Sequence, residues 1–105
     1  MPFDGTSYEV AASPVTRMLM DGKQRLQLGW CRGTMRQRGS ACMIGSLEVA
    51  DFEVFVEAEK ILLQAINSFG HSYRSVPEFN DDPGRTQQQV LAVYDKAIEL
   101  SNPLS

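Results

Sequence analysis

The segment DFEVFVEAEKILLQAINSFG, residues 51–70, has the most regular helical pattern in the chain and constrains the fold most strongly. Its polar residues recur at spacings of four, three, four and three, which places them on one helical face: Glu53, Glu57, Lys60, Gln64 and Asn67. The opposite face is apolar and consists of Phe55, Ala58, Leu62, Ala65, Ile66 and Phe69. Asp51 is a favourable N-cap and Gly70 a favourable stop, so we predict a central helix between them.

A second amphipathic helix is predicted for SPVTRMLMDGKQRLQLG, residues 13–29. Ser13 is a suitable N-cap, Pro14 suits the first helical position, and Gly29 is a natural stop. Its apolar or small residues share one face: Val15, Met18, Leu19, Gly22 and Leu26. Gly22 either allows another element to pack closely or interrupts the helix, and the sequence leaves both alternatives open.

The last predicted helix is TQQQVLAVYDKAIELS, residues 86–101. Thr86 and Gln89 have the spacing of a capping box, and Asn102-Pro103 ends the segment. Its expected buried stripe consists of Val90, Leu91, Tyr94, Ala97 and Ile98. The preceding segment, HSYRSVPEFNDDPGR, reads as a loop with one helical turn at SVPEFND.

The segment WCRGTMRQRGSA, residues 30–41, has no helical period and contains Gly33 and Gly39. We predict a loop or a short β-hairpin with its tip near RQRG. SACMIGSLEVA, residues 40–50, is predicted to resume as a short helix capped by Ser40. Gly45 would then let Trp30 approach closely, which makes Trp30 the expected structural anchor of this region.

Together these elements predict a mainly α fold, a small three-to-four-helix domain with a short irregular or β-hairpin insert near residues 30–40. A chain of 105 residues has room for one core, and its hydrophobic fraction of 43% is near the globular average. We expect residues 1–12 to form a loosely ordered N-terminal arm and residues 13–105 to form a single helical domain.

Three short motifs resemble a family of small bacterial and phage proteins that is classed as a domain of unknown function. Their residues in this chain are Trp30, Cys31 and Gly33, then Cys42, Gly45 and Leu47, then Asn80, Asp81, Arg85, Thr86 and Val90. The motifs are Trp-Cys-x-Gly, Cys-x-x-Gly-Ala-Leu and Asn-Asp followed by Arg-Thr. Here Ser46 replaces the usual alanine, and Phe79 stands where a tryptophan is common. The resemblance implies a small, mostly helical fold and no particular activity.

The chain has few residues from which a catalytic centre or a metal site could be built. Cys31 and Cys42 are the only cysteines, and His71 is the only histidine. A structural zinc site needs four ligands, and a Cys–His nucleophile needs a third group that orients the imidazole. The glycines do not fit a phosphate-binding fingerprint. We therefore predict no catalytic residue, no metal and no cofactor, and the sequence favours a protein that is not an enzyme.

The distribution of charge is uneven along the chain. Residues 1–45 carry six basic and three acidic side chains, whereas residues 46–105 carry four basic and ten acidic ones. Two oppositely charged faces that attract each other would explain this pattern, and so would a partner-binding surface of one sign. We do not expect a nucleic-acid partner, because the net charge is −3 and the helix predicted after the arginines begins with SACMIG, a poor recognition surface. Phe55 and Val56, beside the main apolar stripe, leave self-association open.

The N-terminal sequence lacks a secretory signal and no apolar run is long enough to cross a membrane, so we expect a cytoplasmic protein with reduced thiols and no membrane partner. We expect a small non-catalytic protein-binding domain, of the kind with which a phage or mobile element inhibits a host defence protein. Its expected partner-binding residues are Arg32, Arg36, Arg38 and Tyr73. The alternative is a small-molecule or nucleotide-binding domain, or a minor enzyme, with a pocket formed by His71, Asn80, Asp81 and Arg85.

Overall fold

The computed structural model describes residues 13–34, 36–48 and 51–102. The helices in this part of the chain are α2 (Pro14–Leu28), α3 (Phe52–Ser68), α4 (Val76–Asn80) and α5 (Gln87–Ser101). The strands β1 (Arg36–Gln37) and β2 (Ser40–Ala41) form an antiparallel hairpin. The prediction of a mainly α domain with a hairpin insert is therefore confirmed. The predicted N-terminal arm lies outside the described residues.

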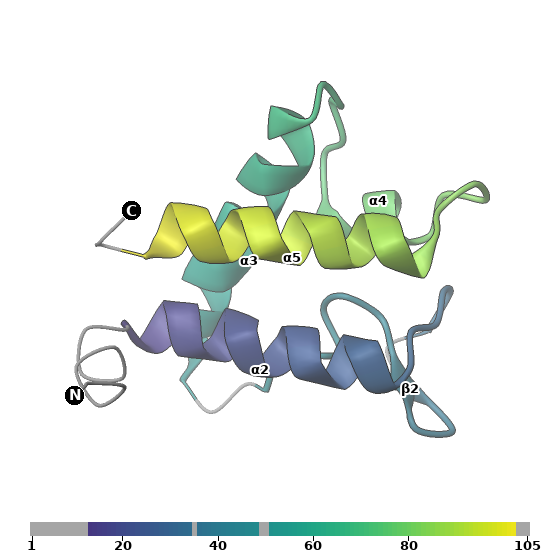
Figure 1. Cartoon of the computed structure of the whole chain (residues 1–105), viewed down its shortest axis with the longest axis horizontal. Coiled ribbons are helices and arrows are strands. Elements are labelled where there is room, and N and C mark those ends of the chain that lie inside the picture. Colours follow the sequence, from purple (N-terminus) through teal and green to yellow (C-terminus); the bar gives the residue numbers. More distant parts are fainter. Residues whose placement is uncertain (1–12, 35, 49–50, 103–105) are drawn as a thin grey trace.

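The helices α2 and α5 lie side by side and antiparallel, and α3 crosses behind them (Figure 1). At one end of this pair, the hydroxyl groups of Thr16 and Ser101 lie 2.8 Å apart. At the other end, the side-chain amide of Gln87 donates a hydrogen bond to the carbonyl of Leu26, at 2.6 Å. The hairpin and α4 lie at this second end, where α2 ends and α5 begins.

The helix boundaries follow from the capping residues that the sequence indicated. The side chain of Ser13 accepts from Thr16 N–H at the start of α2, and Asp51 accepts from two N–H groups at the start of α3. The capping box of Thr86 and Gln89 is formed at the start of α5. Each cap satisfies backbone donors that have no partner inside the helix. No helix in the described residues is both long and apolar enough to cross a membrane.

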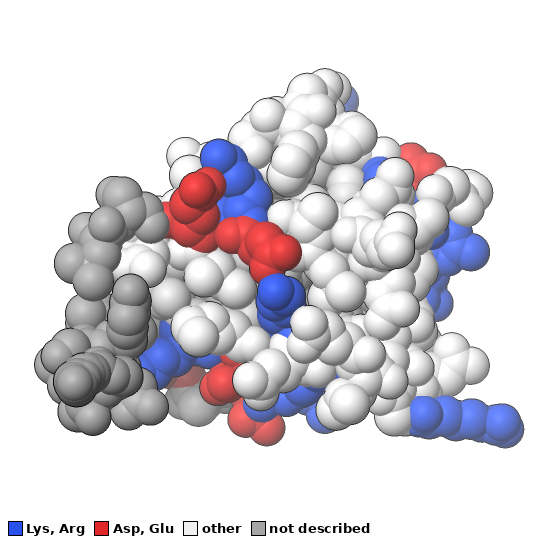
Figure 2. Space-filling model, viewed as in Figure 1, with Lys and Arg blue, Asp and Glu red and all other residues white. Residues whose placement is uncertain are grey.

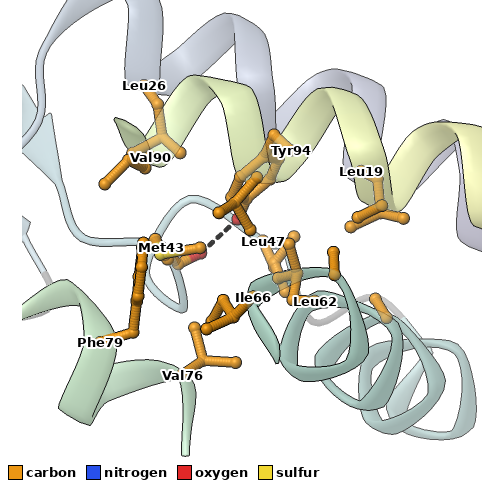
Figure 3. Close-up of a cluster of buried hydrophobic side chains, with 14 of the residues drawn as sticks. Leu19, Leu26, Met43, Leu47, Leu62, Ile66, Val76, Phe79, Val90 and Tyr94 are labelled. Atoms are coloured by element: carbon orange, nitrogen blue, oxygen red, sulfur yellow. Dashed lines mark hydrogen bonds between the residues drawn. The ribbon is translucent and has the colours of Figure 1, made fainter. Parts of the chain in front are cut away.

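The core lies between α2, α3 and α5 and is closed at one end by α4 and by residues 43–47 (Figure 3). Tyr94 of α5 is fully buried at its centre, and its hydroxyl donates to the carbonyl of Met43 at 2.6 Å. The same hydroxyl lies 2.7 Å from the side-chain oxygen of Ser46. Burial raises the pKa of Tyr94, so the phenol stays protonated and can donate.

Replacing Tyr94 by phenylalanine is expected to lower the free energy of unfolding by about 1–3 kcal/mol, because the buried carbonyl of Met43 and hydroxyl of Ser46 each lose a partner. Urea unfolding of the two proteins measures the difference. Because Tyr73 has a half-exposed phenol at the surface, Tyr73→Phe is the matched control and should cost less. Equal stability of the wild-type and Tyr94→Phe proteins would show that this hydroxyl does not hold residues 43–46.

Gly22 lies inside α2 and allows close packing there, which resolves one of the alternatives left open by the sequence. A β-carbon at this position would lie 3.1 Å from side-chain atoms of Leu47, Ser46 and Tyr94. The helix continues through Gly22 as far as Leu28. A larger residue would therefore force α2 away from α5 and from residues 46–47.

Two local predictions are wrong. Residues 43–46 form turns rather than a helix, and Ser40 belongs to β2 instead of capping a helix. The carbonyl of Met43 accepts from the side chains of Tyr94 and Ser46, while Leu47 N–H bonds to Ile44. These bonds take the place of a helical ladder, so a close approach of Trp30 to a helix at Gly45 does not occur. The helical turn predicted at SVPEFND is confirmed and is α4.

The buried face of α3 is shorter than predicted. Ala58, Leu62, Ala65 and Ile66 are buried, but Phe69 at the C-cap is 53% exposed. On α5, Leu91 and Ile98 are only half-buried, and Val93 lies in the core although its position was not predicted. The C-terminal end of α3 therefore extends beyond the core.

Candidate functional site

The side chain of Asn80 joins segments that are far apart in the sequence. It is 1% exposed and lies at the end of α4. Its carbonyl oxygen accepts from the indole N–H of Trp30 at 2.8 Å and from the backbone N–H of Met43 at 3.1 Å. Its amide nitrogen donates to the carbonyl of Cys31 at 3.2 Å and to the carboxylate of Asp81 at 2.9 Å. We call these five residues the Asn80 clamp.

The clamp ends a short stretch of parallel pairing between residues 29–31 and residue 41. Ala41 N–H donates to Gly29, Cys31 N–H donates to Ala41, and Trp30 and Ala41 form a parallel bridge. The next bond of such a ladder would join Met43 N–H to the Cys31 carbonyl. The carboxamide of Asn80 binds both of these groups instead. Asn80 thereby satisfies one buried and one partly buried backbone group that this ladder leaves without partners.

Gly29 allows the hairpin to approach the end of α2. A β-carbon at Gly29 would lie 2.7 Å from the Ser40 hydroxyl and 3.1 Å from the carbonyl of Gly39. Any larger residue would push β2 away from α2. The hairpin is thus held on one side by α2 and on the other by the Asn80 clamp.

The loop before the hairpin is tied to the loop after α4. The carboxylate of Asp81 accepts from Gly33 N–H at 2.9 Å. The guanidinium of Arg32 donates to the carbonyls of Asp82 and Pro83, at 3.1 and 2.7 Å, and lies 5.9 Å from the ring centre of Trp30. Arg32 was predicted to bind a partner, but its guanidinium already binds these internal groups.

A second cluster surrounds Tyr73. Its hydroxyl donates to the carboxylate of Asp82 at 2.6 Å and accepts from the guanidinium of Arg85 at 2.8 Å. Arg85 also donates to the carbonyl of Phe79 and lies 3.6 Å from the centre of its ring. The ring of His71 lies 5.4 Å from Tyr73 and 5.6 Å from Phe79. We call these five residues the Tyr73 cluster.

Hydrogen bonding shifts two pKa values in the Tyr73 cluster away from neutrality. The bond to Asp82 raises the pKa of Tyr73, and the same bond, helped by Gly84 N–H, lowers the pKa of Asp82. Tyr73 therefore stays protonated and Asp82 stays ionised at physiological pH. Such a pair is suited to holding the loop in place, whereas an acid–base catalyst needs a pKa near the working pH.

The predicted pocket residues are close together but do not all line one cavity. A shallow hollow of about 790 Å³ is lined by residues 70–73, 78 and 81–83, which include His71, Tyr73 and Asp81. Asn80 is buried in the clamp, and Arg85 is held by Phe79, Tyr73 and Gln89. Among the described residues, no group of three or more histidine, cysteine or acidic side chains could hold a metal ion.

The two cysteines differ in exposure. Cys42 is 7% exposed, and its sulfur accepts from Gly45 N–H. Cys31 is half-exposed, and its thiol donates to the carbonyl of Thr34 at 3.5 Å. Partial burial, the nearby Cys42 and the charge of Asp81 raise the pKa of Cys31. A raised pKa lowers the fraction of nucleophilic thiolate at neutral pH.

The arginines of the hairpin form an exposed surface. Arg36 and Arg38 are exposed, and their guanidinium groups form no hydrogen bond or ion pair with the described residues. They line a hollow of about 330 Å³ that also includes Leu28, whose side chain is 87% exposed. Basic side chains stand out along the right-hand edge of the molecule, where the hairpin lies (Figure 2). We call Leu28, Arg36, Gln37 and Arg38 the hairpin surface.

Arg38 has an unusual backbone conformation at the tip of this hairpin. Its φ is 46° and that of Gly39 is 84°, so both residues of the turn are in the left-handed region. Two-residue hairpin turns of this kind favour Asn-Gly or Gly-Gly. An arginine there costs about 1 kcal/mol relative to glycine. The hairpin with Arg38 is therefore less stable than it would be with glycine at this position, and it exposes a guanidinium group at its tip.

Some of the basic side chains in the first half of the chain form ion pairs with acidic side chains in the second half. Lys23 of α2 pairs with Asp95 of α5, and Arg25 pairs with Glu48 at 3.3 Å. The guanidinium of Arg25 also donates to the carbonyl of Ser46 at 2.6 Å. These contacts join basic groups of the first half to acidic groups of the second. Arg36 and Arg38 remain outside this pairing.

Comparison with known protein families identifies the family of this chain. Residues 11–100 match the profile of DUF6197, a family of unknown function. The chain belongs to DUF6197. No curated protein and no solved structure matches this DUF6197 chain. The family resemblance expected from the short motifs is confirmed at the level of an uncharacterised family, and the match spans all the described helices and strands except the last residue of α5.

The sequence predicted Asn80 as a pocket residue and did not indicate that its side chain joins the segments flanking the hairpin to α4. Asparagine next to Asp81 in NDDPG is typical of a turn, so the local sequence favoured that interpretation. A signal was nevertheless present in SVPEFN, where a one-turn helix ends with Phe79 and Asn80. Both of these side chains are buried, the first in the core and the second in the clamp.

Proposed function

We propose that this protein is a non-catalytic binding domain that docks an acidic segment of a partner protein on the hairpin surface. The observation that carries the proposal is Arg38, an exposed arginine at a turn position that favours asparagine or glycine. Strained conformations of this kind persist where a function needs the side chain. A guanidinium group in that position is available to form a bidentate pair with a carboxylate.

The neighbours of Arg38 support a protein partner rather than a small anion. Arg36 adds a second positive charge, and Leu28 adds an exposed apolar side chain beside the same hollow. Binding sites for proteins combine an apolar or arginine anchor with a charged rim. An acidic segment that carries one apolar residue would match both features.

The rigidity of the support also favours this surface. The hairpin is fixed by its pairing with residues 29–31, by the close approach at Gly29 and by the Asn80 clamp. A surface on a rigid support loses less conformational freedom when it binds. Tyr73 and Arg32 contribute to this support through their internal hydrogen bonds.

The alternative, a small-molecule site or minor enzyme near His71 and Asp81, has less support. The polar groups of Tyr73, Asp81 and Asp82 at that hollow are bound to other residues of the chain. Tyr73 and Asp82 have pKa values displaced from neutrality, which is unsuitable for acid–base chemistry. A thermal shift with a nucleotide or metabolite that is abolished by His71→Ala would favour this alternative.

The narrower role of a phage or mobile-element inhibitor of a host defence protein depends on the identity of the partner. It stays a prediction of the sequence. A captured partner that is a host enzyme, and whose activity falls when this protein binds, would establish it.

Replacing Arg38 by asparagine separates stability from binding. The variant has Asn-Gly at the turn, so its free energy of unfolding is expected to rise by about 0.5–1 kcal/mol. The protein it captures from cells that encode this chain should nevertheless bind more weakly, because the guanidinium is lost. Quantitative mass spectrometry of pull-downs with both proteins, together with urea unfolding, measures the two effects.

Arg74→Asn is the matched control, because Arg74 is an exposed arginine just before α4 and does not line the hollow beside the hairpin surface. It should leave capture unchanged. If Arg38→Asn and the wild-type protein capture the same proteins in equal amounts, the hairpin surface is not the binding site.

A further inference from the structure

Cys31 and Cys42 occupy neighbouring positions on two adjacent extended segments. Trp30 and Ala41 form a parallel bridge, and Cys31 N–H donates to the carbonyl of Ala41 at 3.1 Å. Each cysteine follows one member of this pair. In parallel pairing the next residues along both segments are opposite each other, and their side chains point to the same face.

Residues that are neighbours in regular parallel pairing have the spacing that a disulfide requires. Adjacent strands lie about 4.8 Å apart, and disulfides join residues whose α-carbons are about 4.4–6.8 Å apart. The Asn80 carboxamide separates the segments immediately beyond the pair, where it binds the Cys31 carbonyl and Met43 N–H. The two sulfur atoms make only weak contacts, with the Thr34 carbonyl and with Gly45 N–H, so little is lost when they move towards each other.

We propose that Cys31 and Cys42 form a redox-active dithiol that closes to an intramolecular disulfide when a small disulfide such as oxidised glutathione is present. The Cys31 thiolate attacks one sulfur of glutathione disulfide, the S–S bond breaks, and one glutathione leaves as a thiolate that takes up a proton. The Cys42 thiolate then attacks the Cys31 sulfur and expels the second glutathione. The protein thereby loses two protons and two electrons, which together are two hydrogen atoms, and one glutathione disulfide is reduced to two thiols.

The exposure of the two cysteines fixes the order of these steps. Cys31 is half-exposed and can meet a reagent from solution, whereas Cys42 is 7% exposed and is reached only by its neighbour. Cys31 is therefore the attacking residue and Cys42 the resolving one. Because its surroundings raise the pKa of Cys31, the first step should accelerate as the pH rises from neutral to mildly alkaline.

The disulfide would enclose the whole hairpin. Both strands and the turn at Arg38–Gly39 lie between Cys31 and Cys42 in the sequence. Oxidation would therefore tie together the two ends of the segment that carries Arg36 and Arg38. The reaction needs no partner protein, so its test is independent of the proposed binding function.

The experiment treats the full chain with glutathione disulfide at mildly alkaline pH and follows its intact mass without reduction. The wild-type protein should lose two hydrogen atoms, remain monomeric, and regain them with dithiothreitol. Cys42→Ser should instead gain one glutathione on Cys31, because the resolving thiol is missing. Cys31→Ser should stay unmodified over the same time, because Cys42 is buried. The oxidised wild-type protein should have a higher Tm than the reduced one, since loop closure restricts the unfolded chain.

Several results would overturn the proposal. Wild-type protein that remains unmodified, that keeps one or two glutathiones, or that forms disulfide-linked dimers would show that the pair does not close. Cys31→Ser that gains glutathione as fast as Cys42→Ser would contradict the order of the steps. A lower Tm of the oxidised monomer would show that the disulfide does not fit this fold.

Discussion

Replacing Asn80 by alanine is expected to lower the free energy of unfolding by about 3–5 kcal/mol, the largest effect of any single polar residue in this fold. The side chain is 1% exposed and serves four partners. Its loss leaves the Met43 N–H, the Cys31 carbonyl and the Trp30 indole without their partner at the edge of the core. Each unsatisfied buried group costs about 1–3 kcal/mol. Urea unfolding of the two proteins gives the difference.

Two measurements make this prediction specific to the clamp. Gln64→Ala removes an exposed amide from α3 and should change the free energy of unfolding by less than about 0.5 kcal/mol. Trp30 is the only tryptophan, so its fluorescence reports on the clamp directly. In folded Asn80→Ala the emission should shift to longer wavelength as the indole loses its partner and becomes more hydrated. Wild-type stability and emission in this variant would show that Asn80 does not hold the hairpin.

Reversing both hairpin charges is expected to weaken partner binding by about 10- to 100-fold. In Arg36→Glu/Arg38→Glu, attraction to an acidic segment becomes repulsion at an exposed surface, and the expected loss corresponds to about 1.4–2.8 kcal/mol. Neither guanidinium bonds to another described residue, so the free energy of unfolding should change little. Titration calorimetry with the captured partner measures the affinity.

Lys60→Glu/Arg74→Glu is the control for net charge. Both residues are exposed, lie outside the hairpin, and give the same total change in charge when reversed. This control should bind within about 3-fold of the wild-type protein, because distant surface charges are largely screened. The affinity of the wild-type protein should also fall as salt is raised, whereas that of the hairpin variant should not. Equal losses in the two double variants would mean that overall charge, not the hairpin, determines binding.

The helices were predictable because their signals are local. Ser13, Asp51 and the pair Thr86 and Gln89 cap the helices that follow them, and the apolar spacing of residues 51–70 gives the correct buried face over its middle turns. The hairpin was predictable from the glycine at its tip. Residues 40–48 were misassigned because this segment has local helical character. Two bonds override it: the Tyr94 hydroxyl donates to the Met43 carbonyl, and Met43 N–H donates to the side chain of Asn80.

The functional arrangement was less predictable because its contacts are distant in sequence. Asn80 accepts hydrogen bonds from Trp30 and Met43, which are 50 and 37 residues away in the sequence. Hydrophobic periodicity gives no information about contacts at such separations. Arg32 and Tyr73 looked available as anchors, but carbonyl and carboxylate groups of residues 82 and 83 bind them. The sequence RQRG indicated a turn, yet the left-handed conformation of Arg38 follows only from the pairing of its neighbours.

Amide hydrogen exchange of the protein, free and bound to its captured partner, tests the central claim most directly. The hairpin surface should be the region protected by the partner, so exchange should slow at Leu28 and across β1, the turn and β2. The Tyr73 cluster and the exposed face of α3 should exchange at the same rate in both states. Protection confined to residues 70–83, or to α3, with none at the hairpin, would contradict the account and place the binding site elsewhere.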